Sequence, residues 1–336
     1  MTLNTTQTNE NTYANAAVID GIKEASTHFQ YITQEVNKVI IGQQQAITFI
    51  LMAILSKGHI LLEGVPGVAK TTMIKAITAA LGLHFKRIQF TPDLLPADLI
   101  GTLIYNPKTL EFETKKGPIF ANLILADEIN RAPAKVQSAL LECMQEHQVT
   151  LGSQTHYLEE PFLVFATQNP LEQAGTYQLP EAQLDRFMFK LTVSYPSARE
   201  EKEIISRSHI LEPIHQVVSQ KDIAAAQELI SQIYCDEKII DYIVSLVDCT
   251  RHPEKYNKDL RAYIKLGASP RATIALYQAA RACAFLKKRH FVIPDDVKFV
   301  CPAILRHRIS LHYEAETQEG AADLVIGKIL QSVPTP

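Results

Sequence analysis

The segment GVPGVAKT, at residues 64–71, constrains this chain more than any other part of its sequence. It follows a short apolar run, His59–Glu63, which is typical of a buried strand, and it leads into a helical pattern that begins at Thr71. Glycines at such a turn let the backbone wrap closely around an anion, so that N–H groups and the helix N-terminus face its charge. The segment therefore predicts a phosphate-binding loop.

Within this loop, we expect Lys70 to reach the β- and γ-phosphates of a nucleotide and the hydroxyl of Thr71 to bind Mg²⁺. The expected nucleotide-binding residues of the loop are Gly64, Val65, Pro66, Gly67, Val68, Ala69, Lys70, Thr71 and Thr72. Ala69 stands where such loops usually have glycine. Because alanine resists positive φ, we expect Ala69 to have right-handed helical dihedrals, with its N–H still facing the phosphates. The alternative is a glycine-rich turn that happens to precede Lys-Thr.

A second apolar strand pattern, Ala121–Ala126, ends in two adjacent carboxylates, Asp127 and Glu128. A strand end beside a phosphate loop is where a metal-holding Asp belongs, and the next carboxylate can polarise the attacking water. We therefore expect Asp127 to hold Mg²⁺, through water, and Glu128 to be the general base. Such a pair can instead cap a helix. The phosphate loop upstream favours the catalytic role of the two carboxylates over the helix cap.

Three further polar residues are candidates for contacts with the γ-phosphate or the attacking water. Asn169 follows the strand pattern Phe162–Thr167 and can orient the water, although Asn before Pro is also an ordinary turn. Arg186 ends a helical segment, and Arg271 follows Ser269-Pro270, a typical helix start. Both arginines can present guanidinium groups to phosphate. The alternatives are a local salt bridge for Arg186 and a solvated first-turn side chain for Arg271.

The order of the patterns predicts an α/β fold with a parallel five-stranded sheet sandwiched by helices, followed by an all-helical domain. Strand patterns occur at 59–63, 85–90, 121–126, 162–167 and 187–193. Two segments, 103–118 and 149–158, read as hairpin insertions. After Pro196 only helical patterns follow. We expect a disordered polar tail at 1–20, a nucleotide-binding core at 21–195 and a helical domain at 196–336.

Composition excludes several classes of protein. With 46% hydrophobic residues and a net charge of -3, the chain is neither a disordered protein nor one with a bulk basic surface for nucleic acid. No signal peptide is visible, and the longest apolar stretch, 46–55, is too short to span a bilayer. The five cysteines are scattered without a CxxC pair, which fits a reducing compartment. We expect a cytoplasmic protein with no membrane span.

Taken together, several segments resemble the AAA+ ATPases and, among them, the MoxR type, over essentially the whole chain beyond the tail. These segments are VIIGQ at 39–43, GVPGVAKT at 64–71, TPDLLPAD at 91–98, GPIFA at 117–121, LADEINRAPAKVQSALLECMQE at 125–146, ATQNP at 166–170, LPEAQLDRF at 179–187, ASPRA at 268–272 and LRHR at 305–308. Ala69 is normal for MoxR proteins. The two hairpin insertions are similar to the helix-2 insert and to the hairpin before sensor 1.

The resemblance implies roles that the residues alone do not establish. It places Ile41 and Gly42 beside the adenine. Asn169 matches sensor 1, and Arg271 matches the sensor 2 arginine of the helical lid. Arg186 matches the arginine finger, which acts on the ATP of a neighbouring subunit, so the resemblance implies a homo-oligomeric ring, commonly a hexamer.

Two residues keep alternative interpretations. AAA+ proteins often use a polar residue of the second strand to steer the catalytic glutamate. Gln89 is the candidate here, although it can equally face solvent. Arg131 can contact a neighbouring nucleotide, or it can cap the local backbone or form a salt bridge.

The resemblance implies an ATP- and Mg²⁺-dependent, chaperone-like motor that remodels or matures a client or adaptor protein. MoxR relatives commonly work with von Willebrand factor A-type proteins in metal insertion or complex assembly. The alternatives are a nucleic-acid-translocating motor, a metal-chelatase motor subunit of the same helix-2-insert branch, and a non-hydrolysing scaffold. The insert carries Lys108, Lys115 and Lys116 but also Glu111 and Glu113, so it lacks the basic excess that nucleic acid requires.

Overall fold

The computed structural model describes the chain except residues 1–4, 66, 169–174, 208–211 and 317–319, and within the described residues it describes side chains from residue 16 onward, apart from that of residue 316. The chain divides into two compact units. One unit comprises residues 34–216, and the other comprises residues 1–33 together with 217–336.

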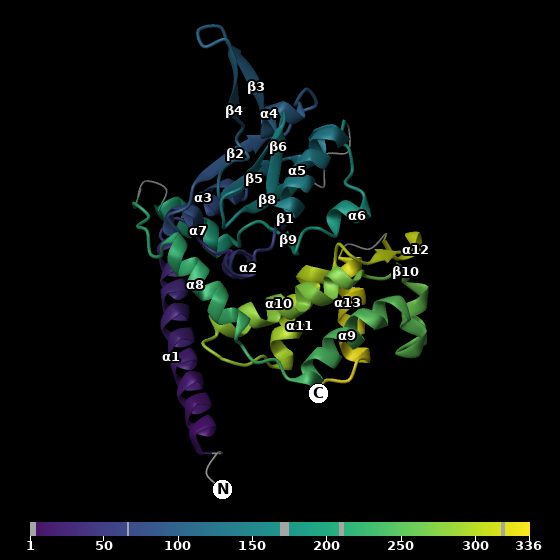
Figure 1. Ribbon diagram of the computed structural model, residues 1–336. Helices are drawn as coiled ribbons and strands as arrows, with labels where there is room; N and C mark the ends of the chain where they lie inside the picture. Colours follow the sequence, from purple (N-terminus) through teal and green to yellow (C-terminus); the bar gives the residue numbers. More distant parts are fainter. Residues whose placement is uncertain (1–4, 66, 169–174, 208–211, 317–319) are drawn as a thin grey trace. The chain divides into compact units, whose positions relative to one another are not determined.

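The first unit is built on a five-stranded sheet with the strand order β2-β5-β8-β1-β9 (Figure 1). Its strands are β1 (Ile60–Glu63), β2 (Phe85–Gln89), β5 (Leu123–Asp127), β8 (Leu163–Gln168) and β9 (Phe189–Thr192). All neighbouring strands are parallel, which confirms the predicted α/β class. The register pairs Glu63 with Gln168, and Gln89 with Asp127. The carboxyl ends of the strands therefore meet along one edge of the sheet.

Strand residues that point to opposite faces of this sheet are equally buried, which shows that both faces are covered. Leu61, Ile124 and Val164 belong to a core cluster that also contains Leu140 of helix α5 (Ala134–Glu146). Their neighbours on the opposite face, such as Phe165, are buried as completely. The other helices of this unit are α2 (Gln44–Leu55), α3 (Lys70–Ala80), α4 (Pro96–Ile100), the 3₁₀ turn η1 (Ile129–Arg131), α6 (Glu181–Leu184) and α7 (Ala198–Arg207). Helix α2 is apolar around most of its circumference, as expected for a helix buried beside the sheet.

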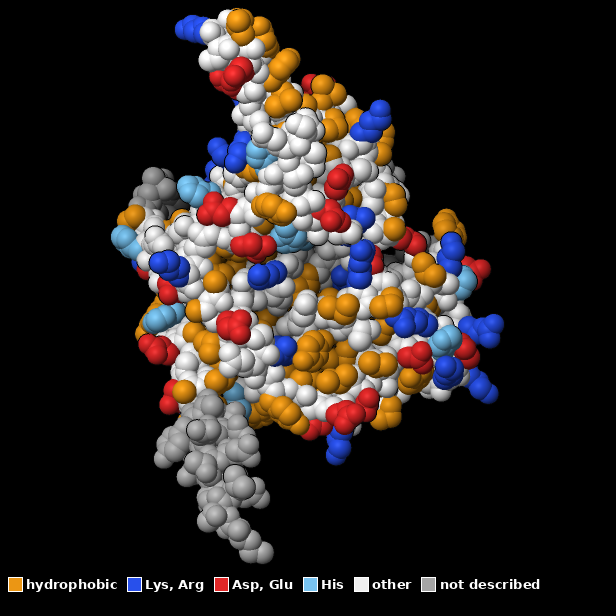
Figure 2. All heavy atoms as spheres, in the orientation of Figure 1, with side chains coloured by type: hydrophobic (Ala, Val, Ile, Leu, Met, Phe, Trp, Pro, Cys, Tyr) orange, Lys and Arg blue, Asp and Glu red, His pale blue; other side chains and the backbone are white. Residues whose placement is uncertain are grey.

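Two hairpins interrupt the core, as the sequence predicts. The first consists of β3 (Gly101–Asn106) and β4 (Glu111–Lys116), and the second of β6 (Gln148–Leu151) and β7 (Gln154–Tyr157). Figure 2 shows hydrophobic side chains along one side of the protruding β3–β4 hairpin, where Leu110 and Phe112 are well exposed.

The second unit is mainly helical, but it also contains a small sheet. Its elements are the part of α1 (Thr5–Val36) up to residue 33, α8 (Gln220–Ser231), α9 (Glu237–Arg251), η2 (Pro253–Lys255), η3 (Lys258–Ala262), α10 (Pro270–Leu286), α11 (Pro294–Leu305), α12 (Tyr313–Glu316) and α13 (Ala321–Ser332). Strands β10 (Ile264–Leu266) and β11 (Ser310–Leu311) pair antiparallel. The predicted helical character of this domain is confirmed, but the short antiparallel pair was not predicted, because strands of three and two residues are too short to produce a periodic pattern.

The structure also differs from the expected domain limits. Helix α7 belongs to the first unit, not to the helical domain expected from residue 196 onward. It is held there by contacts such as the one between Arg207 Nη1 and the carbonyl of Asn37 at 3.4 Å. The structure also begins α1 at Thr5, inside the segment expected to be a disordered tail. Residues 5–20 contain neither glycine nor proline, so no helix breaker opposes this start.

Within the described residues, no helix combines the length and apolar character needed to cross a membrane. All five cysteines are free, and four of them are buried.

A buried histidine joins the sheet to α5 at the end opposite the carboxyl ends of the strands. The backbone N–H of Val164 donates to His59 Nδ1 at 3.0 Å, so Nε2 carries the proton and donates to the carbonyl of Met144, also at 3.0 Å. The bond that Nδ1 accepts requires the neutral ring. Burial lowers the pKa of His59 to about 4.

This histidine predicts a pH-dependent stability. The unfolded chain binds a proton at residue 59 below about pH 6.5, whereas the folded chain does not until about pH 4. Stability should therefore fall as the pH falls through this window, by about 3 kcal/mol in total. Urea unfolding of His59→Gln between pH 7.5 and 4.5 should show a flatter pH dependence than the wild type. The same substitution at the exposed His84 is the control, and it should leave the pH dependence unchanged. If the unfolding free energy of His59→Gln depended on pH as steeply as that of the wild type, His59 would not be the source of the effect.

Candidate functional site

The predicted phosphate loop connects β1 to α3, at the carboxyl edge of the sheet. A Cβ atom at Gly64 would lie 2.5 Å from the carbonyl oxygen of Val193, so only glycine fits there. Gly67 has a φ of 87°, a conformation that favours glycine. The ammonium group of Lys70 donates to the carbonyl of Gly64 at 2.6 Å, so the lysine folds back over its own loop. Pro66, also among the predicted loop residues, lies outside the described residues.

Ala69 differs from the expectation. Its φ of 57° and ψ of 22° are left-handed, so the prediction of right-handed helical dihedrals is wrong. The physical reason is the tight turn: Ala69 is the N-cap of α3, and its carbonyl already accepts the N–H of Met73 at 2.9 Å. A left-handed residue at this point turns the chain from the loop into the helix, although it costs alanine about 1–2 kcal/mol.

Ala69→Gly should therefore stabilise the protein. Relief of the left-handed strain outweighs the larger backbone entropy of glycine in the unfolded chain, which leaves a net gain of about 0.5–1 kcal/mol. The matched control is Ala79→Gly, at an exposed position inside α3, which should destabilise by about 0.5–1 kcal/mol. Chemical denaturation measures both changes, and equal destabilisation by the two variants would contradict the strain at residue 69.

The predicted carboxylates lie at the end of β5, where Thr167 of the neighbouring strand β8 holds them. Thr167 Oγ1 donates to Asp127 Oδ1 at 2.6 Å and accepts the backbone N–H of Glu128 at 2.8 Å. Glu128 itself has a left-handed φ of 56°, which turns its side chain away from the strand direction. Sequence reasoning missed Thr167, because the adjacency of β5 and β8 becomes apparent only in the folded sheet.

Strand β2 supplies the second group of contacts to the carboxylates. Arg87 donates to Asp127 Oδ2 from Nε at 3.0 Å and from Nη2 at 2.6 Å. Gln89 Nε2 donates to Glu128 Oε2 at 2.7 Å, so this amide faces the glutamate. Arg131 Nε lies 3.2 Å from the same oxygen, so this arginine forms a salt bridge, one of the alternatives that the sequence left open. Arg87 was also missed, although its spacing from Gln89 places both side chains on one side of the strand.

The phosphate loop and the carboxylates share one electrostatic environment. Burial lowers the pKa of Lys70, and the negative charges of Asp127 and Glu128 oppose this shift. The ammonium group of Lys70 therefore interacts with both carboxylates at the edge of the sheet.

The oxygen groups at this edge fit a magnesium ion. Thr71 offers a hydroxyl and Asp127 a carboxylate. Mg²⁺ is typically held by one or two protein oxygens, with waters and phosphate oxygens completing its shell.

The remaining predicted residues are only partly located. Arg186 follows α6, and its Nη1 donates to the carbonyl of Leu141 at 2.9 Å, while its buried Nε has no partner in the described structure. Ser269 caps α10 by accepting the N–H of Arg271 at 3.1 Å, as predicted. Arg271 belongs to the second unit, whereas the phosphate loop and the two carboxylates described above belong to the first. Asn169 lies outside the described residues.

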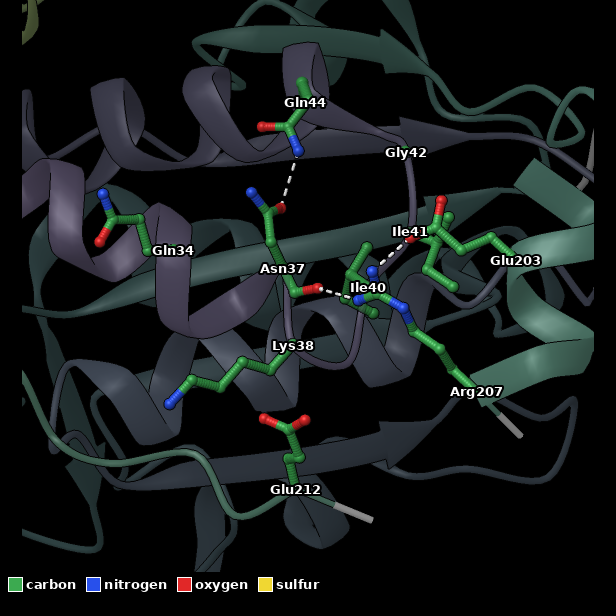
Figure 3. Close-up of a pocket in the computed structure, with 10 residues that line it drawn as sticks. All are labelled: Gln34, Asn37, Lys38, Ile40, Ile41, Gly42, Gln44, Glu203, Arg207 and Glu212. Atoms are coloured by element: carbon green, nitrogen blue, oxygen red, sulfur yellow. Dashed lines mark hydrogen bonds and ion pairs between the residues drawn. The ribbon is translucent and has the colours of Figure 1, made fainter. Parts of the chain in front are cut away.

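Ile41 and Gly42 line a cavity of about 440 Å³ (Figure 3). It lies between the loop that precedes α2 and the side chains of Glu203 and Arg207 on α7. A Cβ at Gly42, whose φ is 72°, would lie 2.2 Å from a carboxylate oxygen of Glu200, so glycine allows the loop to approach α7 closely. None of the described residues of the phosphate loop lines this cavity.

Comparisons with known proteins agree with this fold. Residues 59–189 match the family model for the ATPase family associated with various cellular activities (AAA), and residues 258–327 match the AAA lid domain. The two matches define the class: an AAA ATPase core with its lid.

Similar proteins narrow the class to a family. The chain is 49% identical to Chaperone MoxR1 of Mycobacterium tuberculosis, over 90% of this chain and 81% of that protein. It is 30% identical to Protein MoxR of Paracoccus denitrificans, over 94% of this chain and 98% of that protein. A crystal structure from Cytophaga hutchinsonii, of a protein provisionally described as an ATPase, has a TM-score of 0.90 and 46% identity, and the match covers 97% of this chain and 99% of that one. The chain belongs to the MoxR family of AAA ATPases.

Proposed function

We propose that this protein binds and hydrolyses ATP with Mg²⁺. The observation that carries the proposal is the convergence of Lys70, Asp127 and Glu128 at one edge of the parallel sheet, where Lys70 experiences the charge of both carboxylates. In this assignment the loop from Gly64 to Thr72 surrounds the phosphates. Thr71 and Asp127 would hold the metal ion, which would neutralise phosphate charge when bound. The adenine lies beside Ile41 and Gly42.

Glu128 is the general base in this proposal, and its surroundings support the role. Gln89 and Arg131 both contact Oε2 of Glu128, which restricts where the carboxylate can point. A positioned carboxylate of this kind can accept a proton from the attacking water. Asn169 orients that water in our assignment, and Arg271 contacts the γ-phosphate from the lid.

We assign Arg186 as an arginine finger that completes the site of a neighbouring subunit in a homo-oligomeric ring, such as a hexamer. Arg186 donates a hydrogen bond to a backbone carbonyl of α5. Because that carbonyl is neutral, the contact does not neutralise the charge of the guanidinium group. An oligomer would then be required for turnover, because the arginine of each subunit acts on another subunit's nucleotide.

The proposed role of this ATPase is the remodelling or maturation of a client protein in the cytoplasm. The similarity to Chaperone MoxR1 supports a chaperone-like role. A von Willebrand factor A-type protein, in metal insertion or complex assembly, is the partner implied by the family. The exposed apolar side chains of the β3–β4 hairpin suit contact with protein better than contact with nucleic acid.

Glu128→Gln should bind ATP with near-wild-type affinity but hydrolyse it about 10²–10⁴-fold more slowly, because the amide cannot accept the proton. Phosphate release and the binding of a fluorescent ATP analogue measure the two properties. Glu142→Gln makes the same change at an exposed position of α5 and should leave both unchanged. Unchanged turnover in Glu128→Gln would exclude this residue as the base.

Arg186→Ala should lower turnover by about 10³–10⁵-fold in the assembled protein. Mixing it with Glu128→Gln should restore part of the activity, because some sites then combine an intact Glu128 with an intact Arg186 from the neighbour. Arg199→Ala, at an exposed position of α7, is the control for loss of an arginine. No recovery on mixing, in samples shown to exchange subunits, would contradict action between subunits.

A further inference from the structure

Arg87 is a residue of the site to which the sequence analysis assigned no role. It lies in β2, and its side chain is 49% exposed. Nε and Nη2 both bind Asp127 Oδ2. Nη2 also donates to Gln89 Oε1 at 2.8 Å. The guanidinium group is therefore held by two partners at once, directly beside the carboxylate that we assign to the metal.

The hydrogen bonds around Arg87 have a fixed direction. A guanidinium group can only donate, so the atom of Gln89 that faces it must be the amide oxygen. The amide nitrogen of Gln89 then faces the carboxylate of Glu128, which accepts. The orientation of Gln89 therefore anchors Arg87 in its place beside Asp127.

Both oxygens of Asp127 have donors in this arrangement. Oδ1 accepts from Thr167, and Oδ2 accepts from Arg87. A divalent cation held at this carboxylate would lie close to the guanidinium group, and like charges at such a distance repel each other. A metal ion at Asp127 and Arg87 in its observed position therefore oppose each other.

We propose that Arg87 is a positioning residue that holds Asp127 and competes with Mg²⁺ for it. By this competition Arg87 reduces the gain in nucleotide affinity that Mg²⁺ provides. This inference rests on the proposed function, in which Asp127 holds the metal of a bound Mg²⁺–ATP.

The test compares the affinity for a non-hydrolysable ATP analogue with Mg²⁺ and with EDTA, by calorimetry or fluorescence. The ratio of the dissociation constant in EDTA to that with Mg²⁺ measures the coupling between metal and nucleotide. Arg87→Gln should increase this ratio about 5–10-fold, because the competing charge is removed, while the affinity in EDTA stays near that of the wild type. Arg87→Lys keeps a cation in place and should lie closer to the wild type.

Lys86→Gln is the matched control, because it removes the same charge from the adjacent exposed position, whose side chain points to the other side of the strand. It should leave the ratio unchanged. A ratio in Arg87→Gln equal to that of the wild type would overturn the inference. So would a fall in affinity in EDTA with no change in the ratio, which would show that Arg87 binds phosphate instead. A wild-type protein whose affinity gains nothing from Mg²⁺ would contradict the proposed function itself, and the inference with it.

Discussion

The site depends on one constraint, the parallel pairing of β1, β5 and β8. Because the strands run in the same direction and in register, their carboxyl ends lie along one edge. The loop after β1, the carboxylates after β5 and Thr167 near the end of β8 are therefore neighbours, although about a hundred residues separate the first from the last. Antiparallel pairing of any of these strands would send its end to the opposite edge and separate these groups.

The groups at this edge carry charges of both signs, and hydrogen bonds between them hold the two carboxylates in place. Lys70 and Arg87 each approach the carboxylates, one from the phosphate loop and one from β2. Thr167 and Gln89 are neutral, and each contacts a carboxylate with its side chain. These contacts restrict where both carboxylates can point, and a fixed orientation of this kind suits the proposed catalytic role.

Much of the fold could be predicted from local patterns, because a buried parallel strand and an amphipathic helix have distinct periodicities. The five strands of the sheet and both hairpins occur where the patterns predict them. The β10–β11 pair was not predicted, since strands so short leave no periodic pattern. Ala69 shows the limit of residue propensity: alanine disfavours the left-handed region, yet the turn into α3 requires it.

The phosphate-loop motif, the adjacent Asp127 and Glu128, and the family to which these motifs belong could be recognised from the sequence alone. Which side chains surround these motifs depends on the folded sheet. Thr167, Arg87 and Gln89 meet the carboxylates only because β8 and β2 flank β5 in the sheet. The physical reason is that motif residues adjacent along the chain can be recognised locally, whereas contacts across a sheet depend on a strand order that local patterns do not encode.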